Sequence, residues 1–232
     1  MKKAIIVGAS SGIGAELARL MSKDGYQLGV TARRTELLES LATELPAKTH
    51  IKTMDIAKTD DTIVALQELI AEMGGVDLVI VCAGIGHQNK ELAWEKEREI
   101  IAVNVTGATA VMGVAMRHFI DKGCGHLVGI SSIAAYMGGA DCPAYNASKA
   151  YLSNYLKGLR GTAKASKKKI HITDIKPGFV DTAMAQGEGL FWVMPADKTA
   201  KQIYKAIRRK RKSTVVTKRW KIIGFMLRRF SK

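Results

Sequence analysis

The chain has 232 residues, three cysteines, 22 glycines and a net charge of +15. This length suits one α/β domain that buries a large core, and an odd cysteine count without paired spacing argues against a disulfide framework or a zinc site. The positive charge is concentrated near the C-terminus, where residues 198–232 contain 14 Lys and Arg and no Asp or Glu. Residues 1–197 therefore carry a net charge of only +1 and lack the broad basic surface of a dedicated nucleic-acid binder.

The N-terminal stretch MKKAIIVG begins like a signal peptide, with two lysines before an apolar run. That run stops at Gly8, which is too early for a secretory core. No stretch reaches the roughly 18 apolar residues of a membrane span. With unpaired cysteines as well, we expect a cytoplasmic protein.

Short apolar runs alternate along the chain with segments of helical periodicity. The runs predict strands at 4–7, 28–31, 51–53, 78–81, 127–130, 170–175 and 214–217. The segments between them predict helices at 15–23, 36–45, 59–73, 97–120, 144–165 and 198–209. This alternation indicates right-handed βαβ units. We therefore expect one doubly wound α/β domain over 1–232, with a parallel sheet of about seven strands between two helical layers.

Three glycines, Gly8, Gly12 and Gly14, lie between the first predicted strand and the first predicted helix. Glycine lets the backbone turn tightly and approach a pyrophosphate, and the following helix N-terminus supplies free N–H groups. A glycine-rich loop without a ligand is the alternative, but the position between strand and helix favours a dinucleotide site.

The end of the second predicted strand indicates which dinucleotide is bound. An NAD site usually has a carboxylate there for the ribose 2′-hydroxyl. This chain instead has Arg33 and Arg34. A guanidinium can pair with a 2′-phosphate, so NADP(H) is favoured over NAD(H), unless the two arginines are simply solvated.

A serine, a tyrosine and a lysine form the candidate chemical centre. Ser132 follows the fifth predicted strand, and Tyr145 and Lys149 lie one turn apart on a predicted helix. A phenol with a pKa near 10 is a poor acid–base group at neutral pH, and a nearby ammonium would lower that pKa. Tyr-x-x-x-Lys alone would be a surface helix, but its combination with Ser132 and a dinucleotide loop predicts a catalytic site.

These motifs resemble the short-chain dehydrogenase/reductase family. The matching residues are GASSGIG at 8–14, DI at 55–56, AG at 83–84, Asn104 within VNV, Ser132, YNASK at 145–149, and PG at 177–178 followed by Thr182. They occur in the family's order over nearly the whole chain.

The resemblance implies a role for each catalytic position. Tyr145 would protonate the substrate oxygen, Ser132 would hydrogen-bond that oxygen, and Lys149 would bind the nicotinamide ribose and lower the pKa of Tyr145. Asn104 would hold a water that links Lys149 to solvent. The implied cofactor-binding residues are Gly8, Ser10, Ser11, Gly12, Ile13, Gly14, Arg33, Arg34, Asp55, Ile56, Ala83, Gly84, Tyr145, Lys149, Pro177, Gly178, Val180 and Thr182. No metal site is expected.

Residues 183–196 predict a substrate lid. Gly187 and Gly189 permit motion, and 190–194 are five consecutive apolar residues. The alternative is ordinary packing of a short helix. A lid of this composition suits a bulky, apolar substrate.

Residues 219–232 predict a basic amphipathic helix in which Trp220, Ile223, Leu227 and Phe230 form one stripe. Basic residues opposite such a stripe are typical of a helix that lies on a membrane surface. Docking on the subunit itself or on an oligomer partner is equally compatible with the pattern. The resemblance implies a homodimer or homotetramer built through helices 101–121 and 144–165, and no nucleic-acid partner is expected.

The sequence thus predicts an NADP(H)-dependent oxidoreductase that interconverts a ketone and a secondary alcohol. The alternative is a nucleotide-sensing or membrane-associated regulatory protein on the same fold. The intact Tyr145 and Lys149 favour the enzyme.

Overall fold

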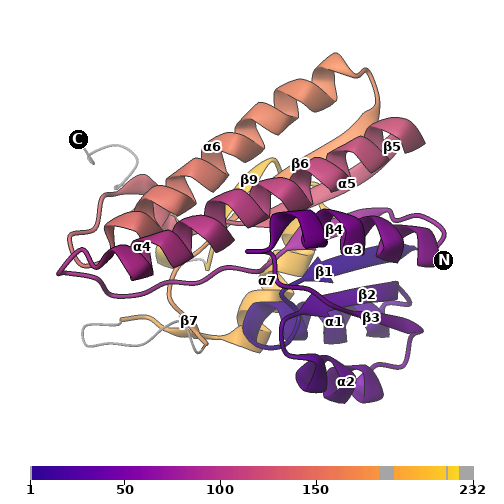
Figure 1. Ribbon diagram of the computed structural model, residues 1–232, viewed down its shortest axis with the longest axis horizontal. Coiled ribbons are helices and arrows are strands. Elements are labelled where there is room, and N and C mark those ends of the chain that lie inside the picture. The colour runs from indigo at the N-terminus through magenta and orange to yellow at the C-terminus, as the bar shows by residue number, and fades with distance from the viewer. Residues whose placement is uncertain (1, 183–190, 218, 225–232) are drawn as a thin grey trace.

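The computed structural model describes residues 2–182, 191–217 and 219–224. Seven strands form one sheet in the order β3-β2-β1-β4-β5-β6-β9, and every neighbouring pair is parallel (Figure 1). Their bounds are β1 Lys3–Val7, β2 Gln27–Ala32, β3 Thr49–Thr53, β4 Leu78–Val81, β5 Cys124–Ile130, β6 Lys169–Pro177 and β9 Ser213–Val216. The predicted seven-stranded parallel sheet is confirmed.

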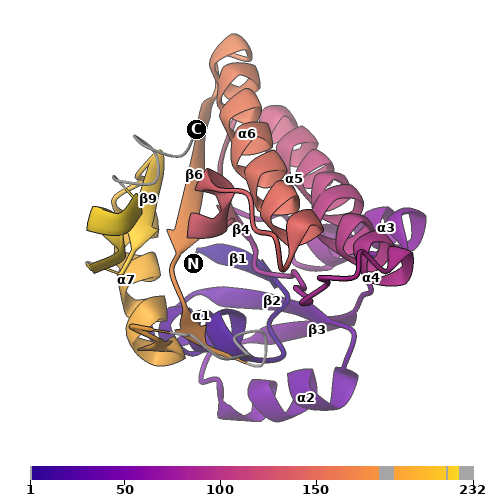
Figure 2. The same cartoon turned by 90° about the vertical axis from the view of Figure 1, so that its left-hand side faces the viewer.

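Helices cover both faces of this sheet (Figure 2). They are α1 Gly12–Lys23, α2 Thr35–Glu44, α3 Thr59–Glu72, α4 Trp94–Ile100, α5 Ala108–Lys122, α6 Pro143–Ala165 and α7 Ala196–Arg208. One core cluster joins the sheet to α3, α5 and α6, and the other joins it to α1, α2 and α7. Successive strand residues alternate between the two clusters, as Ile5 and Ile6 do, which is why the strands are apolar on both faces.

The predicted helix at 97–120 is part of a longer helical segment, Trp94–Lys122, in which the π-helical turn η1, Ile101–Gly107, separates α4 from α5. By length and composition this segment could cross a membrane. However, 56% of its most apolar window is buried inside the fold, as expected of a core helix. The segment ends at Gly123, whose φ of 82° is a left-handed conformation that glycine adopts without strain.

Two short strands were not predicted from the sequence. β7, Val180–Asp181, pairs in parallel with β8, Met194–Pro195. Each has two residues, which is too short to produce a periodic pattern. This small sheet joins the chain just after β6 to the start of α7.

Candidate active site

The glycine turn between β1 and α1 is shaped for close backbone contact. A Cβ atom on Gly8 would lie 2.5 Å from the backbone nitrogen of Ala83, and one on Gly14 would lie 2.1 Å from the carbonyl oxygen of Gly8. Gly12 has a φ of 55°, and its Cβ position is 3.0 Å from Cγ2 of Thr182. The turn is therefore packed closely against Ala83 at Gly8 and against Thr182 at Gly12.

The same turn fits the pyrophosphate of a dinucleotide. Helix α1 begins at Gly12, and the N-cap residue Ser11 makes no side-chain cap hydrogen bond. The N–H groups of the first turn are thus left for a ligand, and the positive end of the helix dipole favours an anionic one. Ser10 and Ile13 flank the turn and are half-buried.

A guanidinium lies beside this turn. Arg34 is the N-cap residue of α2, and its Nη2 donates to Oγ of Ser10 at 3.1 Å and to Oγ of Ser11 at 3.3 Å. Arg33 is also exposed, at the end of β2. The two serines and the two arginines thus form a cationic, hydrogen-bonding rim next to the glycine turn.

Further residues predicted to lie along the cofactor come from the ends of β3 and β4. Asp55 accepts a hydrogen bond from the backbone N–H of Ala57 at 3.1 Å, which shapes the turn after β3. Ile56 is buried beneath the start of α5. A Cβ on Gly84 would lie 3.1 Å from Nζ of Lys149 and 3.2 Å from Oδ1 of Asn104. Gly84 therefore borders the predicted catalytic residues.

Lys149 lies under the ring of Tyr145, one turn away on α6. Its side chain is only 4% exposed, Nζ donates to the carbonyl oxygen of Ile130 at 3.3 Å, and Nζ is 5.6 Å from the centroid of the Tyr145 ring. Burial lowers the pKa of Lys149 to about 8, and the carboxylate of Asp174 acts in the opposite direction. The lysine is thus a buried cation that loses its charge in mildly alkaline solution.

The pKa of Tyr145 is raised above its ordinary value, chiefly because the phenol is desolvated, while a hydrogen bond with Ser132 acts to lower it. Lys149 is not among the groups that set this direction, so its expected lowering of the Tyr145 pKa stays a prediction. Burial outweighs the neighbouring groups, and the ammonium lies under the ring. The phenol is consequently a protonated group at neutral pH, suited to donating a proton.

Ser132 is held in place by the chain that follows β5. It is the N-cap residue of the 3-10 helix η2, Ile133–Tyr136, and its Oγ accepts from the backbone N–H of Ala134 at 3.1 Å. The residue is 8% exposed. The hydroxyl is therefore fixed at the carboxyl end of the sheet, within reach of the Tyr145 hydroxyl.

Asn104 lies in the π-helical turn, a feature that is often found at functional sites. Its Nδ2 donates to the carbonyl oxygen of Ile85 at 2.8 Å and to Oγ of Ser148 at 3.0 Å, and its Oδ1 accepts from the N–H of Ile85 at 2.8 Å. Both amide hydrogens are thus used within the protein. The side chain fixes the chain after β4 against α6, and the expected water link stays a prediction.

A buried carboxylate that the sequence reasoning missed connects the elements of this site. Asp174 on β6 accepts from Oγ of Ser131 at 2.5 Å and from Oγ of Ser153 at 2.8 Å, and it forms an ion pair with Lys176. Asp174 is 1% exposed and Lys176 is 3% exposed. Ser131 precedes Ser132, and Ser153 lies one turn after Lys149, so Asp174 braces both catalytic positions.

Gly86 is a second residue that was missed. A Cβ atom there would lie 2.9 Å from Cδ2 of Tyr145 and 3.1 Å from Cε2. The ring of the tyrosine therefore packs directly on this backbone. The stretch AGIG, in which a second glycine closely follows Gly84, is the sequence signal that could have identified it.

The turn after β6 carries the last predicted cofactor residues. Pro177 and Val180 are buried, and Oγ1 of Thr182 donates to the carbonyl oxygen of Val180 at 3.3 Å. A Cβ on Gly178 would lie 2.3 Å from ring atoms of Trp220, so the C-terminal part of the chain packs on this turn. In the predicted lid, 183–190 lie outside the described residues. Of the predicted C-terminal helix, 219–224 are helical and 225–232 lie outside them.

Among the residues that the structure describes, no three His, Cys, Asp or Glu side chains are grouped so that they could hold a metal ion. The described site is instead a glycine turn with a cationic rim, next to a buried Ser132–Tyr145–Lys149 centre. The hydrogen-bond donors and cations of this site therefore fit an organic, anionic cofactor.

Comparisons with known proteins show which family this chain belongs to. The family model for short-chain dehydrogenases matches residues 2–190. An uncharacterised oxidoreductase of Myxococcus xanthus is 37% identical over 188 residues, covering 79% of this chain and 74% of that protein. The human 3-oxoacyl-[acyl-carrier-protein] reductase is 30% identical over 187 residues, covering 80% and 78%.

Among solved structures, a short-chain dehydrogenase of Sphingobium yanoikuyae in complex with NADPH has a TM-score of 0.84 at 23% identity, covering 97% of this chain and 93% of that one. At this identity the likeness shows the fold. Together with the family match, it establishes what the glycine turn and the Ser132–Tyr145–Lys149 centre indicated. The chain belongs to the short-chain dehydrogenase/reductase family, whose members are oxidoreductases that use a nicotinamide cofactor.

Proposed function

We propose that this protein interconverts a ketone and a secondary alcohol with NADP(H) as the hydride carrier. The observation that carries the proposal is the convergence of Ser132 and Lys149 on Tyr145. Ser132 is close enough to act on the pKa of the Tyr145 phenol, and Lys149 is buried against the same ring and beside Gly84. This centre lies at the carboxyl ends of the central strands, where open α/β sheets bind ligands.

The nicotinamide, when bound, supplies or accepts the hydride. In the reductive direction, Tyr145 donates a proton to the carbonyl oxygen, and Ser132 hydrogen-bonds that oxygen and orients it. The raised pKa of Tyr145 keeps its proton available at neutral pH. The Lys149 ammonium, with its pKa of about 8, supplies a positive charge beneath the ring that stabilises the phenolate formed after transfer.

The preference for NADP(H) rests on the arginines beside the glycine turn. The Arg34 guanidinium already bonds two serine hydroxyls of that turn, and a 2′-phosphate offers it a charged acceptor in their place. A carboxylate that would bond a free 2′-hydroxyl is missing at the end of β2, where Arg33 and Arg34 stand.

Titration of NADPH and NADH into the protein tests this preference. Arg34→Gln should weaken NADPH binding about tenfold, which is the loss of one charged hydrogen bond, and should leave NADH binding unchanged. Lys23→Gln, at the exposed end of α1, is the matched control and should change neither affinity. Equal weakening of both cofactors by Arg34→Gln would refute the assigned role.

We further propose an apolar substrate, because Phe191, Trp192 and Val193 are 49%, 48% and 39% exposed in the segment that follows the predicted lid hinge. The human relative, named for its action on a 3-oxoacyl group, also suits a carbonyl on an apolar chain. A carbonyl panel measured by NADPH oxidation tests this proposal. Turnover of small hydrophilic ketones alone would count against it.

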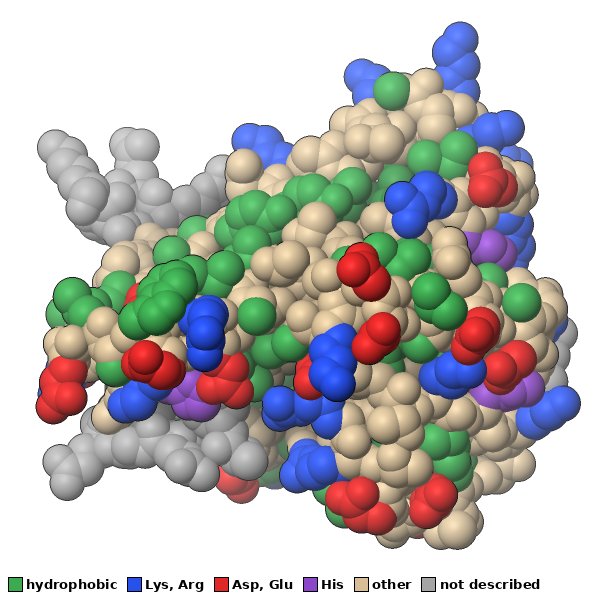
Figure 3. Space-filling model, in the orientation of Figure 1, with side chains coloured by type: hydrophobic (Ala, Val, Ile, Leu, Met, Phe, Trp, Pro, Cys, Tyr) green, Lys and Arg blue, Asp and Glu red, His purple; other side chains and the backbone are tan. Residues whose placement is uncertain are grey.

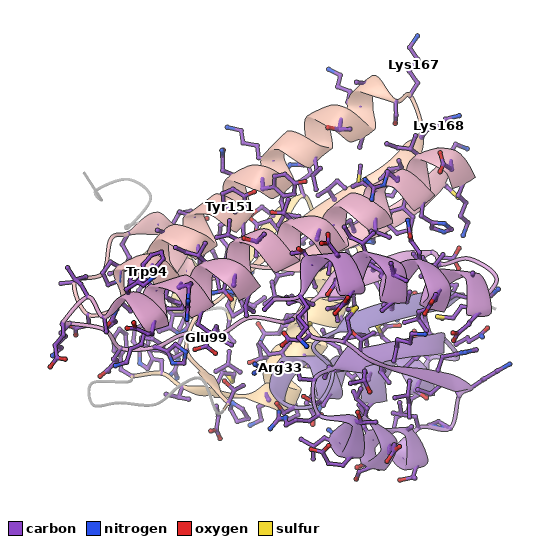
Figure 4. All side chains as sticks on the ribbon, viewed as in Figure 1. Arg33, Trp94, Glu99, Tyr151, Lys167 and Lys168 are labelled. Carbon is purple, nitrogen blue, oxygen red and sulfur yellow. The ribbon has the colours of Figure 1, made fainter. Side chains whose placement is uncertain are left out.

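A homo-oligomer is proposed through the face formed by α4, α5 and α6. A band of hydrophobic side chains runs over these helices (Figure 3). The exposed hydrophobic residues of α4, of the π-helical turn between α4 and α5, and of α6 include Trp94 at 60%, Ile101 at 41% and Tyr151 at 38% exposure. Trp94 and Tyr151 are labelled on this face in Figure 4. Patches of this kind mark association surfaces, and light scattering would measure the mass of the assembly in solution.

A cytoplasmic location is proposed from the three free cysteines.

A further inference from the structure

Four aromatic rings join the C-terminal part of the chain to the turn after β6. The aromatic cluster consists of Phe179, Phe191, Trp192 and Trp220. Trp220 is its centre, because its ring centroid lies 5.1 Å from that of Phe191 and 5.2 Å from that of Phe179. Trp220 is only 3% exposed, and its Nε1 donates to the carbonyl oxygen of Trp192 at 3.5 Å.

This cluster fixes one face of the helical residues 219–224 against the protein. The Trp220 ring occupies the space that a Cβ on Gly178 would need. At the other end, the Cβ position of Gly224 is 3.1 Å from Cγ2 of Val215 and 3.6 Å from the ring of Tyr136. The start of the basic C-terminal segment is therefore docked beside the turn predicted to contact the nicotinamide.

The solvent-exposed residues of the same region are apolar and basic. Ile222 is 67% exposed, Arg219 and Lys221 are exposed, and the Arg219 guanidinium lies 5.9 Å from the centroid of the Trp192 ring. We call the following set the exposed face: Phe191, Trp192, Val193, Arg219, Lys221 and Ile222. It combines two aromatic and two aliphatic side chains with two cations.

The charge of the neighbouring chain indicates what this face binds. Residues 198–232 contain 14 Lys and Arg and no acid, so a second copy presenting the same face would be repelled. Exposed aromatic rings with cations could also stack on single-stranded nucleic acid, but residues 1–197 carry only +1 and offer no groove of positive charge to follow a strand. Aromatic and aliphatic side chains among basic ones are typical of contact with anionic lipid headgroups.

We propose that the exposed face docks on the surface of an anionic lipid bilayer. Phe191, Trp192, Val193 and Ile222 enter the interfacial region, and Arg219 and Lys221 pair with lipid phosphates. Because Trp220 ties this face to Gly178, docking places the nicotinamide side of the active site next to the membrane. An apolar substrate can then reach the site from the lipid phase. Docking itself needs neither cofactor nor turnover, so it stands apart from the proposed reaction.

Co-sedimentation of the full chain with lipid vesicles tests the proposal. Vesicles of phosphatidylcholine with about one-third phosphatidylserine should bind the protein, and pure phosphatidylcholine vesicles should bind it at least tenfold more weakly. Arg219→Glu/Lys221→Glu should lower binding to the anionic vesicles about tenfold or more, and Ile222→Asp should lower it severalfold. All three side chains are exposed, so the variants should keep the fold and bind NADPH like the unaltered chain.

Two controls match these variants. Lys167→Glu/Lys168→Glu is the control for the Arg219/Lys221 variant, because it makes the same change of charge at the end of α6 that lies far from Trp94 (Figure 4). Val64→Asp is the control for Ile222→Asp, because Val64 is an exposed aliphatic residue on α3, with 54% exposure. Neither should alter vesicle binding by more than about twofold. The proposal is overturned if the Lys167/Lys168 variant loses as much binding as the Arg219/Lys221 variant. It is also overturned if neutral vesicles bind equally, or if single-stranded DNA binds through this face and vesicles do not.

Discussion

Replacing Asp174 with asparagine removes a buried charge while keeping the size of the side chain. The carboxylate accepts from Ser131 and Ser153 and faces the Lys176 ammonium, and neither charged side chain is more than 4% exposed. An amide oxygen can accept the same hydrogen bonds only in part, and it does not offset the charge of Lys176. We therefore expect Asp174→Asn to destabilise the folded protein.

The size of this loss follows from the burial of the pair. Removing one partner of a buried ion pair costs about 3–5 kcal/mol, because the other charge is left in a medium that solvates it poorly. That is a large fraction of the roughly 5–15 kcal/mol by which domains are stable. Neutralising both partners, as in Asp174→Asn/Lys176→Met, should cost less than the sum of the single changes by about 2 kcal/mol.

Urea denaturation of the two single variants and the double variant measures the free energies of unfolding. Activity adds a second readout, because the Asp174 carboxylate favours the charged form of Lys149. Its loss should move the alkaline decline of kcat/KM to lower pH. A cost below about 1 kcal/mol for Asp174→Asn, or strict additivity in the double variant, would refute the bracing role.

Three further predictions concern the catalytic centre. Tyr145→Phe should lower kcat by about 10²–10⁴-fold and leave NADPH binding within about threefold, measured by steady-state kinetics and titration; full turnover would contradict the proton-transfer role. The kcat/KM for NADPH should fall above pH 8. Burial lowers the pKa of Lys149 to about 8, so the lysine loses its charge there, while the phenol of Tyr145, whose pKa is raised, stays protonated. A pH profile that stays flat to pH 10 would contradict the prediction that Lys149 loses its proton before Tyr145 does. Gly86→Ala should lower kcat at least about tenfold, because the added Cβ pushes the Tyr145 ring aside. Gly138→Ala is the control and should leave kcat unchanged, because nothing lies within 4 Å of its added Cβ. Equal activity of the two variants would count against the packing of the Tyr145 ring on Gly86.

The elements that the sequence predicted well are those with a local signature. Each of the seven predicted strands corresponds to a strand of the sheet, with ends that differ by up to three residues. Periodicity and turn residues depend on near neighbours in the chain, so they can be read without a structure. The same holds for the one-turn spacing of Tyr145 and Lys149, and for the glycines between β1 and α1. The NADP(H) preference, which stays a prediction, likewise rests on neighbouring residues in the chain, the arginines after β2.

Contacts between residues far apart in the chain had no such signature. Asp174 bonds Ser131 across 43 residues, and Trp220 packs on Gly178, which no spacing rule indicates. The two-residue strands β7 and β8, and the π-helical turn that carries Asn104, depend likewise on which elements become neighbours in the folded sheet.

The charge state of the centre was also decided by the fold. The one-turn spacing shows only that Lys149 lies near Tyr145. The structure buries both groups, and this burial raises the pKa of the phenol and lowers that of the ammonium. The sequence by itself determined the sheet, the dinucleotide turn and the family. Only the tertiary structure decided which carboxylate braces the catalytic residues, how far they are desolvated, and where the basic C-terminal segment begins to dock. Burial and long-range neighbours are properties of the whole packed chain, and local sequence patterns do not encode them.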